Sequence, residues 1–287
     1  TIILFLFFSH LVYAQEKINF RIEGIGVGDV FMFIRLINEI QGNNCVVEVE
    51  ERMKSIFQRS FPKAAFCTSS ELTDRFQELG GARQVLLGSL PYFLNLEESN
   101  DINSQPYIKP DIKEVSNLRD KYCCDRSNET GKELLVGISW MSKGSRGNYR
   151  SIPLERWVNT LEIPGARFIS LQYGIQSSDI PKNINLVNDT SFDPLEDLDK
   201  ACAQVAAMDL IISIDNSIVH FAGAMGIETW VLLPKSPDWR WQAECNDSYW
   251  YDSVRLYRQE NPRTWTDCLE VVNQDLQKWI KSNSSKG

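Results

Sequence analysis

The sequence predicts an α/β protein with parallel sheets, organised as two domains. Short apolar runs alternate with segments of helical periodicity along most of the chain. This alternation begins near residue 18 and begins again near residue 134, after a polar stretch at residues 127–132. The chain has 287 residues, which is enough for two domains of roughly 100–150 residues each. We therefore expect two Rossmann-like domains that face each other, with ligands at the carboxyl ends of the strands.

The first domain is predicted to span residues 15–130. A strand at 18–22 leads into a glycine-containing turn, and apolar residues from Val30 to Ile40 then recur at helical spacing. A second strand is expected at 45–49 and a second helix at 52–61. Residues 80–91 and 97–113 are predicted to be irregular connections, and 113–126 a helix.

The second domain is predicted to span residues 131–287 and to end in a helix at 265–280. Strands are expected at 134–139, 167–172, 210–214 and 229–233, and helices at 153–160, at 194–207 and after Asp215. Each polar loop that follows a strand, at 24–29, 141–151 and 215–220, is a candidate ligand contact.

Residues 1–14 form an apolar segment that ends like a signal-peptidase site but lacks a positively charged start and a Met. They are either the remnant of a signal peptide or the start of a truncated chain, and we favour truncation. The seven cysteines are odd in number and scattered, which favours reduced thiols over a disulfide framework or a zinc site. We expect a cytoplasmic protein, with secretion or membrane association left open by the apolar segment.

The net charge of −8 and the lack of a basic stretch interleaved with aromatics argue against nucleic acid as a partner. An acidic protein can still bind a phosphorylated ligand through a few placed cations and helix ends.

The strongest candidate for such a site is the segment 210–226, an apolar strand followed by a polar turn and a helix of small residues. Asp215, Asn216 and Ser217 are good N-cap residues, and the helix start offers unpaired N–H groups to a phosphate. His220, one of two histidines in the chain, lies one turn into that helix. The alternative is an ordinary capped turn with a packed histidine.

Two further loops carry candidate residues. The loop 141–151 holds Lys143, Arg146 and Arg150, which suit phosphate, or else form a solvated basic loop. The turn with Gly26 and Gly28 places Asp29 at the first turn of a helix, where it is a catalytic candidate or an ordinary cap. The glycine spacing departs from the dinucleotide fingerprint, so a nicotinamide-dependent oxidoreductase remains a minor alternative.

Asp238 and Trp239 lie in a segment dense in aromatics, which could stack on a ligand ring or belong to the core. Asp197 and Asp199 have a spacing that can hold a metal, but they fall in a helical pattern and are interpreted as a solvated face. We therefore expect no metal and no cofactor.

Several motifs occur in order: VGISW (136–140), RSIPLERW (150–157), FISLQYG (168–174), DLIISIDNSIVHFAGAMG (209–226), WVLLPKSPDWRW (230–241) and SYWYDSVRLYRQ (248–259). Together they resemble the glycosyltransferase domain found behind tetratricopeptide repeats in many bacterial proteins. That domain is similar to the heptosyltransferase group, glycosyltransferase family 9. In the first half the likeness is weaker and rests on GVGDV (26–30) and LLGSLPYFL (86–94).

The resemblance implies a GT-B-like fold and an inverting, metal-independent transfer of a sugar from a nucleotide-diphosphate sugar to an unknown glycan, lipid or protein acceptor. Asp29 maps to the family's candidate base, and Asp215 and His220 map to the turn that meets the pyrophosphate. The implied donor-binding residues are Lys143, Arg146, Arg150, Gln172, Asp215, Asn216, Ser217, His220, Asp238 and Trp239. Asn216 replaces the family's usual Thr, and an upstream repeat domain is a possible missing partner. The alternative is a non-catalytic relative that binds a sugar nucleotide or a glycan.

Overall fold

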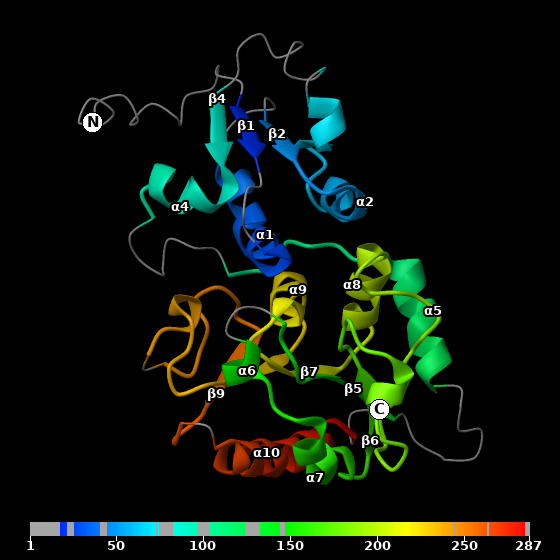
Figure 1. Ribbon diagram of the computed structural model, residues 1–287. Coiled ribbons are helices and arrows are strands. Elements are labelled where there is room, and N and C mark those ends of the chain that lie inside the picture. The colour runs from blue at the N-terminus through cyan, green and yellow to red at the C-terminus, as the bar shows by residue number, and fades with distance from the viewer. Residues whose placement is uncertain are drawn as a thin grey trace. The chain divides into compact units, whose positions relative to one another are not determined.

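The computed structural model describes residues 18–21, 26–40, 45–72, 74, 83–96, 104–123, 133–143, 147–243, 245–262 and 264–284. The chain divides into two compact units, residues 1–103 with 107–109, and residues 104–106 with 110–287 (Figure 1). Each unit has its own parallel sheet, which confirms the predicted α/β class. Residues 1–14 and the polar stretch 127–132 lie outside the described residues.

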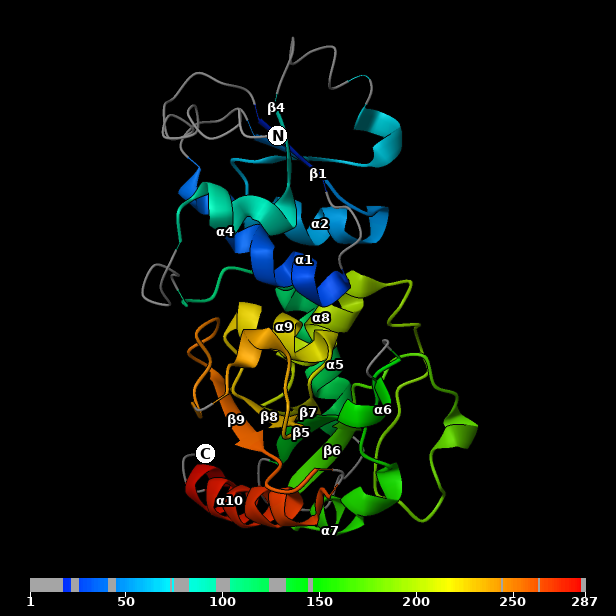
Figure 2. The same cartoon turned by 60° about the vertical axis from the view of Figure 1, so that its left-hand side comes forward.

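The first unit contains a parallel sheet of order β3-β2-β1-β4. Its strands are β1 (Ile18–Arg21), β2 (Cys45–Glu48), β3 (Ala65–Cys67) and β4 (Arg83–Leu86). Its labelled helices, α1 (Val27–Ile34), α2 (Glu51–Ser60) and α4 (Leu90–Phe93), lie on one side of this sheet in both views (Figure 2). The rings of Phe31, Phe57 and Phe66 pack together beneath it, with centroids 5.1 and 5.8 Å apart.

Both edge strands of this sheet differ from the sequence interpretation. Residues 83–86 form β4, which pairs in parallel with β1, so the expectation of an irregular connection there was wrong. The other edge strand, β3, was not predicted at all. Edge strands pair on one side only and are short, so the pairing that defines them involves distant residues and leaves little periodicity in the sequence.

The second unit contains a parallel sheet of order β6-β5-β7-β8-β9. Its strands are β5 (Leu134–Ser139), β6 (Ala166–Ser170), β7 (Leu210–Ile214), β8 (Thr229–Leu233) and β9 (Val254–Arg258). One face is covered by α5 (Ile112–Cys123), α8 (Leu198–Ala206) and α9 (Ser217–Met225), and the other by α7 (Val158–Leu161) and α10 (Thr266–Ser284) (Figure 1). Because both faces are covered, β5, β7 and β8 are buried along their whole length.

Helix α5 belongs to the second unit, whereas the sequence interpretation placed residues 113–126 in the first domain. Lys121 and Tyr122 of α5 both donate to the carboxylate of Asp189, at 2.7 and 2.9 Å. Gln204 of α8 donates in turn to the Tyr122 hydroxyl at 2.8 Å. Arg119 binds Asp209 at 2.6 Å. These polar contacts fix α5 against the second sheet, and the units divide N-terminal to it.

Several helices are shorter than their patterns predict. The helix expected at 153–160 is a 3₁₀ turn, Leu154–Trp157, followed by one turn of α-helix, α7. The helix expected from 194 begins at Leu198, because the Asp197 side chain accepts the Lys200 N–H at 2.9 Å and caps it there. In the part of the chain that the structure describes, no helix is long and apolar enough to cross a bilayer.

Candidate functional site

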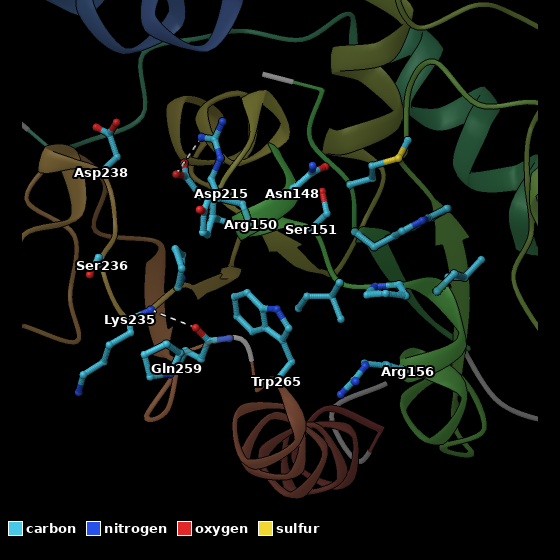
Figure 3. Close-up of a pocket in the computed structure, with 18 residues that line it drawn as sticks. Asn148, Arg150, Ser151, Arg156, Asp215, Lys235, Ser236, Asp238, Gln259 and Trp265 are labelled. Carbon is cyan, nitrogen blue, oxygen red and sulfur yellow. Dashed lines mark hydrogen bonds and ion pairs between the residues drawn. The ribbon is translucent and has the colours of Figure 1, made fainter. Parts of the chain in front are cut away.

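The second unit contains a cavity of about 1340 Å³ at the carboxyl ends of β5, β7, β8 and β9 (Figure 3). This is the edge at which open parallel sheets bind ligands. Its lining is Trp140, Met141, Asn148, Tyr149, Arg150, Ser151, Ile152, Pro153, Leu154, Arg156, Asp215, Pro234, Lys235, Ser236, Asp238, Gln259, Pro262 and Trp265. Of the predicted donor-binding residues, Arg150, Asp215 and Asp238 are in this set.

The turn after β7 forms as its sequence predicts. The Asn216 side chain is the N-cap of α9 and accepts the Ile218 N–H at 3.0 Å. Its amide nitrogen donates to the Ser139 hydroxyl at 2.8 Å, which ties the start of α9 to the end of β5. The result is a helix N-terminus held at the strand ends, beside Asp215 of the cavity lining.

Arg150 and Asp215 form an ion pair in the cavity wall, with Nη1 3.1 Å from the carboxylate (Figure 3). Asp215 is almost completely buried, with 3% of its side chain exposed. Arg150 ends α6 (Gly147–Arg150), a single helical turn within the predicted basic loop. Its Nη2 donates to Ser142, while its Nε is buried with no hydrogen-bond partner among the described residues.

Gln172 acts as a clamp between the ends of two strands. Its Oε1 accepts the backbone N–H groups of Trp140 and Met141 at 3.0 and 2.8 Å. Its Nε2 donates to the carbonyls of Met141 and Tyr173, both at 3.1 Å. The side chain is buried and bound to main chain, so Gln172 fixes the course of the chain that follows β5 and forms the cavity wall.

His220, in the first turn of α9, is buried and is not among the residues that line the cavity. Its Nδ1 lies 3.0 Å from the Tyr251 hydroxyl, and its ring stacks on Trp241 with centroids 5.6 Å apart. Gly223, one turn further along, is a glycine because a Cβ there would lie 2.4 Å from the Tyr251 ring. The small residues of α9 therefore make room for Tyr251, which in turn holds His220.

Of the remaining candidates of the second unit, Lys143, Ser217 and Trp239 are not among the residues that line the cavity. The Lys143 ammonium donates to the Gly174 carbonyl at 2.6 Å, and Arg146 lies outside the described residues. Ser217 is partly buried in the first turn of α9. Trp239 is 62% exposed beneath the Arg240 guanidinium, which also pairs with Asp238.

In the first unit, Asp29 is the third residue of α1, and its carboxylate accepts the Gly26 N–H at 3.1 Å. This contact pairs the N–H of Gly26, which is the N-cap residue of α1. The capping alternative placed Asp29 itself at the N-cap, whereas Asp29 caps the helix from its third position. Gly28 is buried in the first turn of the helix.

Arg156, Lys235, Gln259 and Trp265 are among the lining residues that sequence reasoning did not name as site residues. Lys235 follows β8, which was predicted, and Gln259 follows β9, which was not. The strand-end rule could therefore have found Lys235 directly, and Gln259 had β9 been assigned. Among the described residues, no group of three or more His, Cys, Asp or Glu side chains could hold a metal ion. Asp197 serves as the cap of α8.

No family model matches the chain. The fold is GT-B-like, and solved structures that share it include glycosyltransferases. The glycosyl transferase family 9 protein from Veillonella parvula has a TM-score of 0.61 at 10% identity, over 96% of this chain and 100% of that one. The ADP-heptose LPS heptosyltransferase II from E. coli has a TM-score of 0.60 at 12% identity, over 92% and 99%.

The iron-containing heptosyltransferase TibC, solved in complex with ADP-D-β-D-heptose, has a TM-score of 0.53 at 11% identity, over 96% of this chain and 78% of TibC. Protein FlbA from Caulobacter vibrioides is 25% identical over 286 residues, which cover 90% of this chain and 46% of FlbA. The chain thus spans about half the length of that curated relative. The solved structures share its fold at low identity.

Proposed function

We propose that the chain is a glycosyltransferase that moves a sugar from a nucleotide-diphosphate sugar to a hydroxyl acceptor. One observation carries the proposal. A cavity large enough for such a donor lies at the strand ends of the second unit, beside the N-terminus of α9, in a fold shared with heptosyltransferases. A neighbour with this fold, TibC, was solved with a nucleotide sugar.

The cavity offers several groups to a diphosphate. Arg150, Arg156 and Lys235 line it, together with Asp215 next to the start of α9. Of the three cations, Arg150 is paired with Asp215, and no ion-pair partner is found for Arg156 or Lys235 among the described residues. The helix start and these cations would stabilise the negative charge of the leaving diphosphate without a metal ion.

The reaction we propose is a single displacement with inversion at the anomeric carbon. The acceptor oxygen forms a bond to that carbon as the bond from carbon to the diphosphate oxygen breaks. Asp29 takes the acceptor proton, and the nucleoside diphosphate leaves. We place the reaction in the cytoplasm, since Cys67, Cys123, Cys202, Cys245 and Cys268 are free thiols, as in reducing compartments.

A thermal-shift screen of nucleotides and nucleotide sugars tests the proposal. A ligand present at 100 times its Kd stabilises the folded chain by about 2.7 kcal/mol, which is a readily measured rise in melting temperature. We expect nucleoside diphosphates and their sugars to raise the melting temperature, and nucleosides alone to do so less. Failure of every nucleoside diphosphate and nucleotide sugar to bind would contradict the proposed function.

A non-catalytic protein that binds a sugar nucleotide is the second candidate. The observation that favours it is the capping bond from Gly26 to Asp29, which gives this aspartate a structural role. The two candidates differ in turnover: slow hydrolysis of a bound donor indicates an enzyme, and an intact donor after long incubation indicates a binding protein.

A further inference from the structure

Residues 104–109, which we call the connector, lie where the chain crosses between the two units. The first three of them belong to the second unit and the last three to the first unit. In the second unit, the Gln105 side chain donates to the carboxylate of Asp252 at 2.9 Å. Pro106 packs against Gly226, which ends α9, so closely that a Cβ on this glycine would lie 2.4 Å from the proline ring. The second unit therefore holds the connector as far as Pro106.

Tyr107 is the first connector residue that belongs to the first unit, and it is bound to α1. Its hydroxyl donates to the backbone carbonyl of Phe31 at 2.7 Å. Phe31 is among the last four residues of α1, whose carbonyls need donors from outside the helix's own pattern. The Arg35 guanidinium lies over the Tyr107 ring, 4.7 Å from its centroid. Both the hydroxyl and the ring of Tyr107 thus engage the C-terminal end of α1.

Lys109 holds the other end of the connector on α2. Its N–H donates to the Ser60 hydroxyl at 2.9 Å, and its carbonyl accepts from the Arg59 guanidinium at 2.8 Å. Ile108, between Tyr107 and Lys109, is buried, with 4% of its surface exposed. The connector is therefore bound to two helices of the first unit, to α1 through Tyr107 and to α2 through Lys109.

Helix α1 also carries Asp29, so the position of this helix determines the position of that carboxylate. Asp29 is its third residue and is bonded to Gly26 at the N-terminal end, whereas Tyr107 is bonded at Phe31, in the last turn. A helix transmits a displacement along its length, because its backbone hydrogen bonds keep it rigid. A catalytic group that is displaced by about 1 Å can lose about 10²-fold in rate.

From this geometry we infer that Tyr107 is a positioning residue. By holding α1, it holds Asp29 in the place from which the carboxylate takes the acceptor proton. The inference rests on the proposed function, in which Asp29 is the base, and adds a residue that acts through α1 rather than on the substrates. The chain that leaves the second unit at Pro106 therefore enters the first unit on the helix that carries the base.

Tyr107→Phe tests the inference, because it removes the hydroxyl and keeps the ring. The assay uses the nucleotide sugar that most raises the melting temperature in the thermal-shift screen, with water as the acceptor and release of the nucleoside diphosphate as the readout. We expect Tyr107→Phe to lower kcat about tenfold or more. Calorimetric affinity for the nucleotide sugar should stay unchanged, because the donor cavity lies in the second unit. Ser60→Ala, which removes the bond from Lys109 to α2, is the matched control and should keep wild-type kcat.

A double-variant cycle shows whether Tyr107 acts through Asp29. In the Asp29→Asn background the base is absent, so adding Tyr107→Phe should lower kcat no further. A merely structural role would instead lower kcat by the same factor in both backgrounds, together with the melting temperature.

The outcomes separate the two ideas. If no nucleotide sugar binds, or the wild type never hydrolyses a bound one, the proposed enzyme fails and this inference fails with it. If the wild type hydrolyses the donor and Asp29→Asn does so equally well, the base assignment and this inference fail, while the glycosyltransferase proposal stands.

Three results overturn the inference alone: wild-type kcat in Tyr107→Phe, an equal loss in Ser60→Ala, or the same loss in both backgrounds of the cycle. Should Tyr107→Phe fail to fold, Arg35→Lys replaces the planar guanidinium over the Tyr107 ring and is read in the same way.

Discussion

Asp29 is a candidate for two roles, a helix-capping residue and the catalytic base. It follows two glycines at the start of α1, and its carboxylate accepts the Gly26 N–H. A carboxylate has about four acceptor sites on its two oxygens, so accepting one capping hydrogen bond does not by itself exclude a role as a base. The capping role and the catalytic role are therefore compatible in structure and must be separated by measurement.

We predict that Asp29→Asn lowers the turnover rate by about 10²–10⁴ and leaves donor affinity and melting temperature unchanged. The amide oxygen of Asn can still accept the Gly26 N–H, but the amide cannot take a proton from the acceptor. Steady-state rates and calorimetric donor binding of the same preparation provide the test.

Asp197→Asn is a matched control, because Asp197 caps α8 through a similar side-chain bond and does not line the cavity. It should keep wild-type turnover. If Asp29→Asn also keeps wild-type turnover, Asp29 is a cap and not the base.

At the residue scale, sequence reasoning worked best where a side chain acts on its own neighbours. Asn216 was expected among the capping residues and does cap α9. Gln172 was expected to bind the donor, which stays a prediction, and its side chain forms hydrogen bonds with main chain at the ends of β5 and β6. Such a clamp joins residues about thirty positions apart, and the spacing of a sequence motif contains no sign of it.

Among elements, the ion pair between α6 and the turn after β7 is the most consequential contact. Among the described residues, Arg150 is the ion-pair partner of Asp215, and the carboxylate is nearly fully buried. Removing one partner of a buried pair leaves an uncompensated charge, which costs more than the pair itself contributes.

We predict that Arg150→Met lowers the free energy of unfolding by about 3 kcal/mol and that adding Asp215→Asn recovers part of the loss. Denaturant unfolding of the wild type, both single variants and the double variant measures the coupling. Arg156→Met is the control, since Arg156 lines the same cavity and forms no ion pair among the described residues, so its loss should change stability little. Additive effects of the two substitutions would contradict a coupled pair.

Because α5 donates hydrogen bonds to Asp189, the stability that this contact contributes depends on pH in the acid range. Burial alone would raise the pKa of Asp189, but hydrogen bonds from Lys121, Ser191 and Tyr122 outweigh it and lower the pKa to about 2. The ordinary value is 3.8. The folded pKa lies below the unfolded one, so the contribution to stability is present above about pH 4 and is lost as the pH falls towards 2.

We predict that Asp189→Asn lowers stability by about 1–2 kcal/mol at neutral pH and that this difference from wild type shrinks as the pH falls from 4 to 2. Urea unfolding at a series of pH values gives both curves. Glu71, whose pKa is also about 2 because Lys54 and Thr68 donate to it, provides the comparison in the first unit. Its Glu71→Gln variant should cost less, because that carboxylate is exposed and screened by solvent. A gap between wild type and Asp189→Asn that stays constant with pH would contradict the assignment.

At the scale of the whole molecule, the alternation of strands and helices predicted both units, because strands and helices each leave a local apolar periodicity in the sequence. The division between the units was not predictable in the same way. The polar stretch 127–132 looks like a linker in the sequence, but α5 is bonded to Asp189, Asp209 and α8 through side chains of Arg119, Lys121 and Tyr122. Composition cannot show which of two cores a connecting helix joins, because the helix carries an amphipathic pattern either way.

We predict that transfer by the whole chain does not require a divalent cation. The cavity supplies Arg150, Arg156, Lys235 and the start of α9 to the leaving diphosphate, and Asp197 is used as a helix cap. Rates measured in EDTA should equal those in buffer alone, with EDTA-treated protein that has been re-supplied with Mg²⁺ as the control. Activity that disappears in EDTA and returns with Mg²⁺ or Mn²⁺ would contradict the prediction.

The attachment of α5 also determines where the chain can be cut. A fragment beginning at residue 131 would leave Asp189 and Gln204 without the side chains of Lys121 and Tyr122, and would uncover the apolar face of α8 that α5 protects. A fragment beginning at residue 104 keeps all of these groups. Anyone who wishes to express the second unit alone, or to exchange it between relatives, should therefore move the junction upstream of α5. A junction placed at the polar stretch would divide the second unit through its own core.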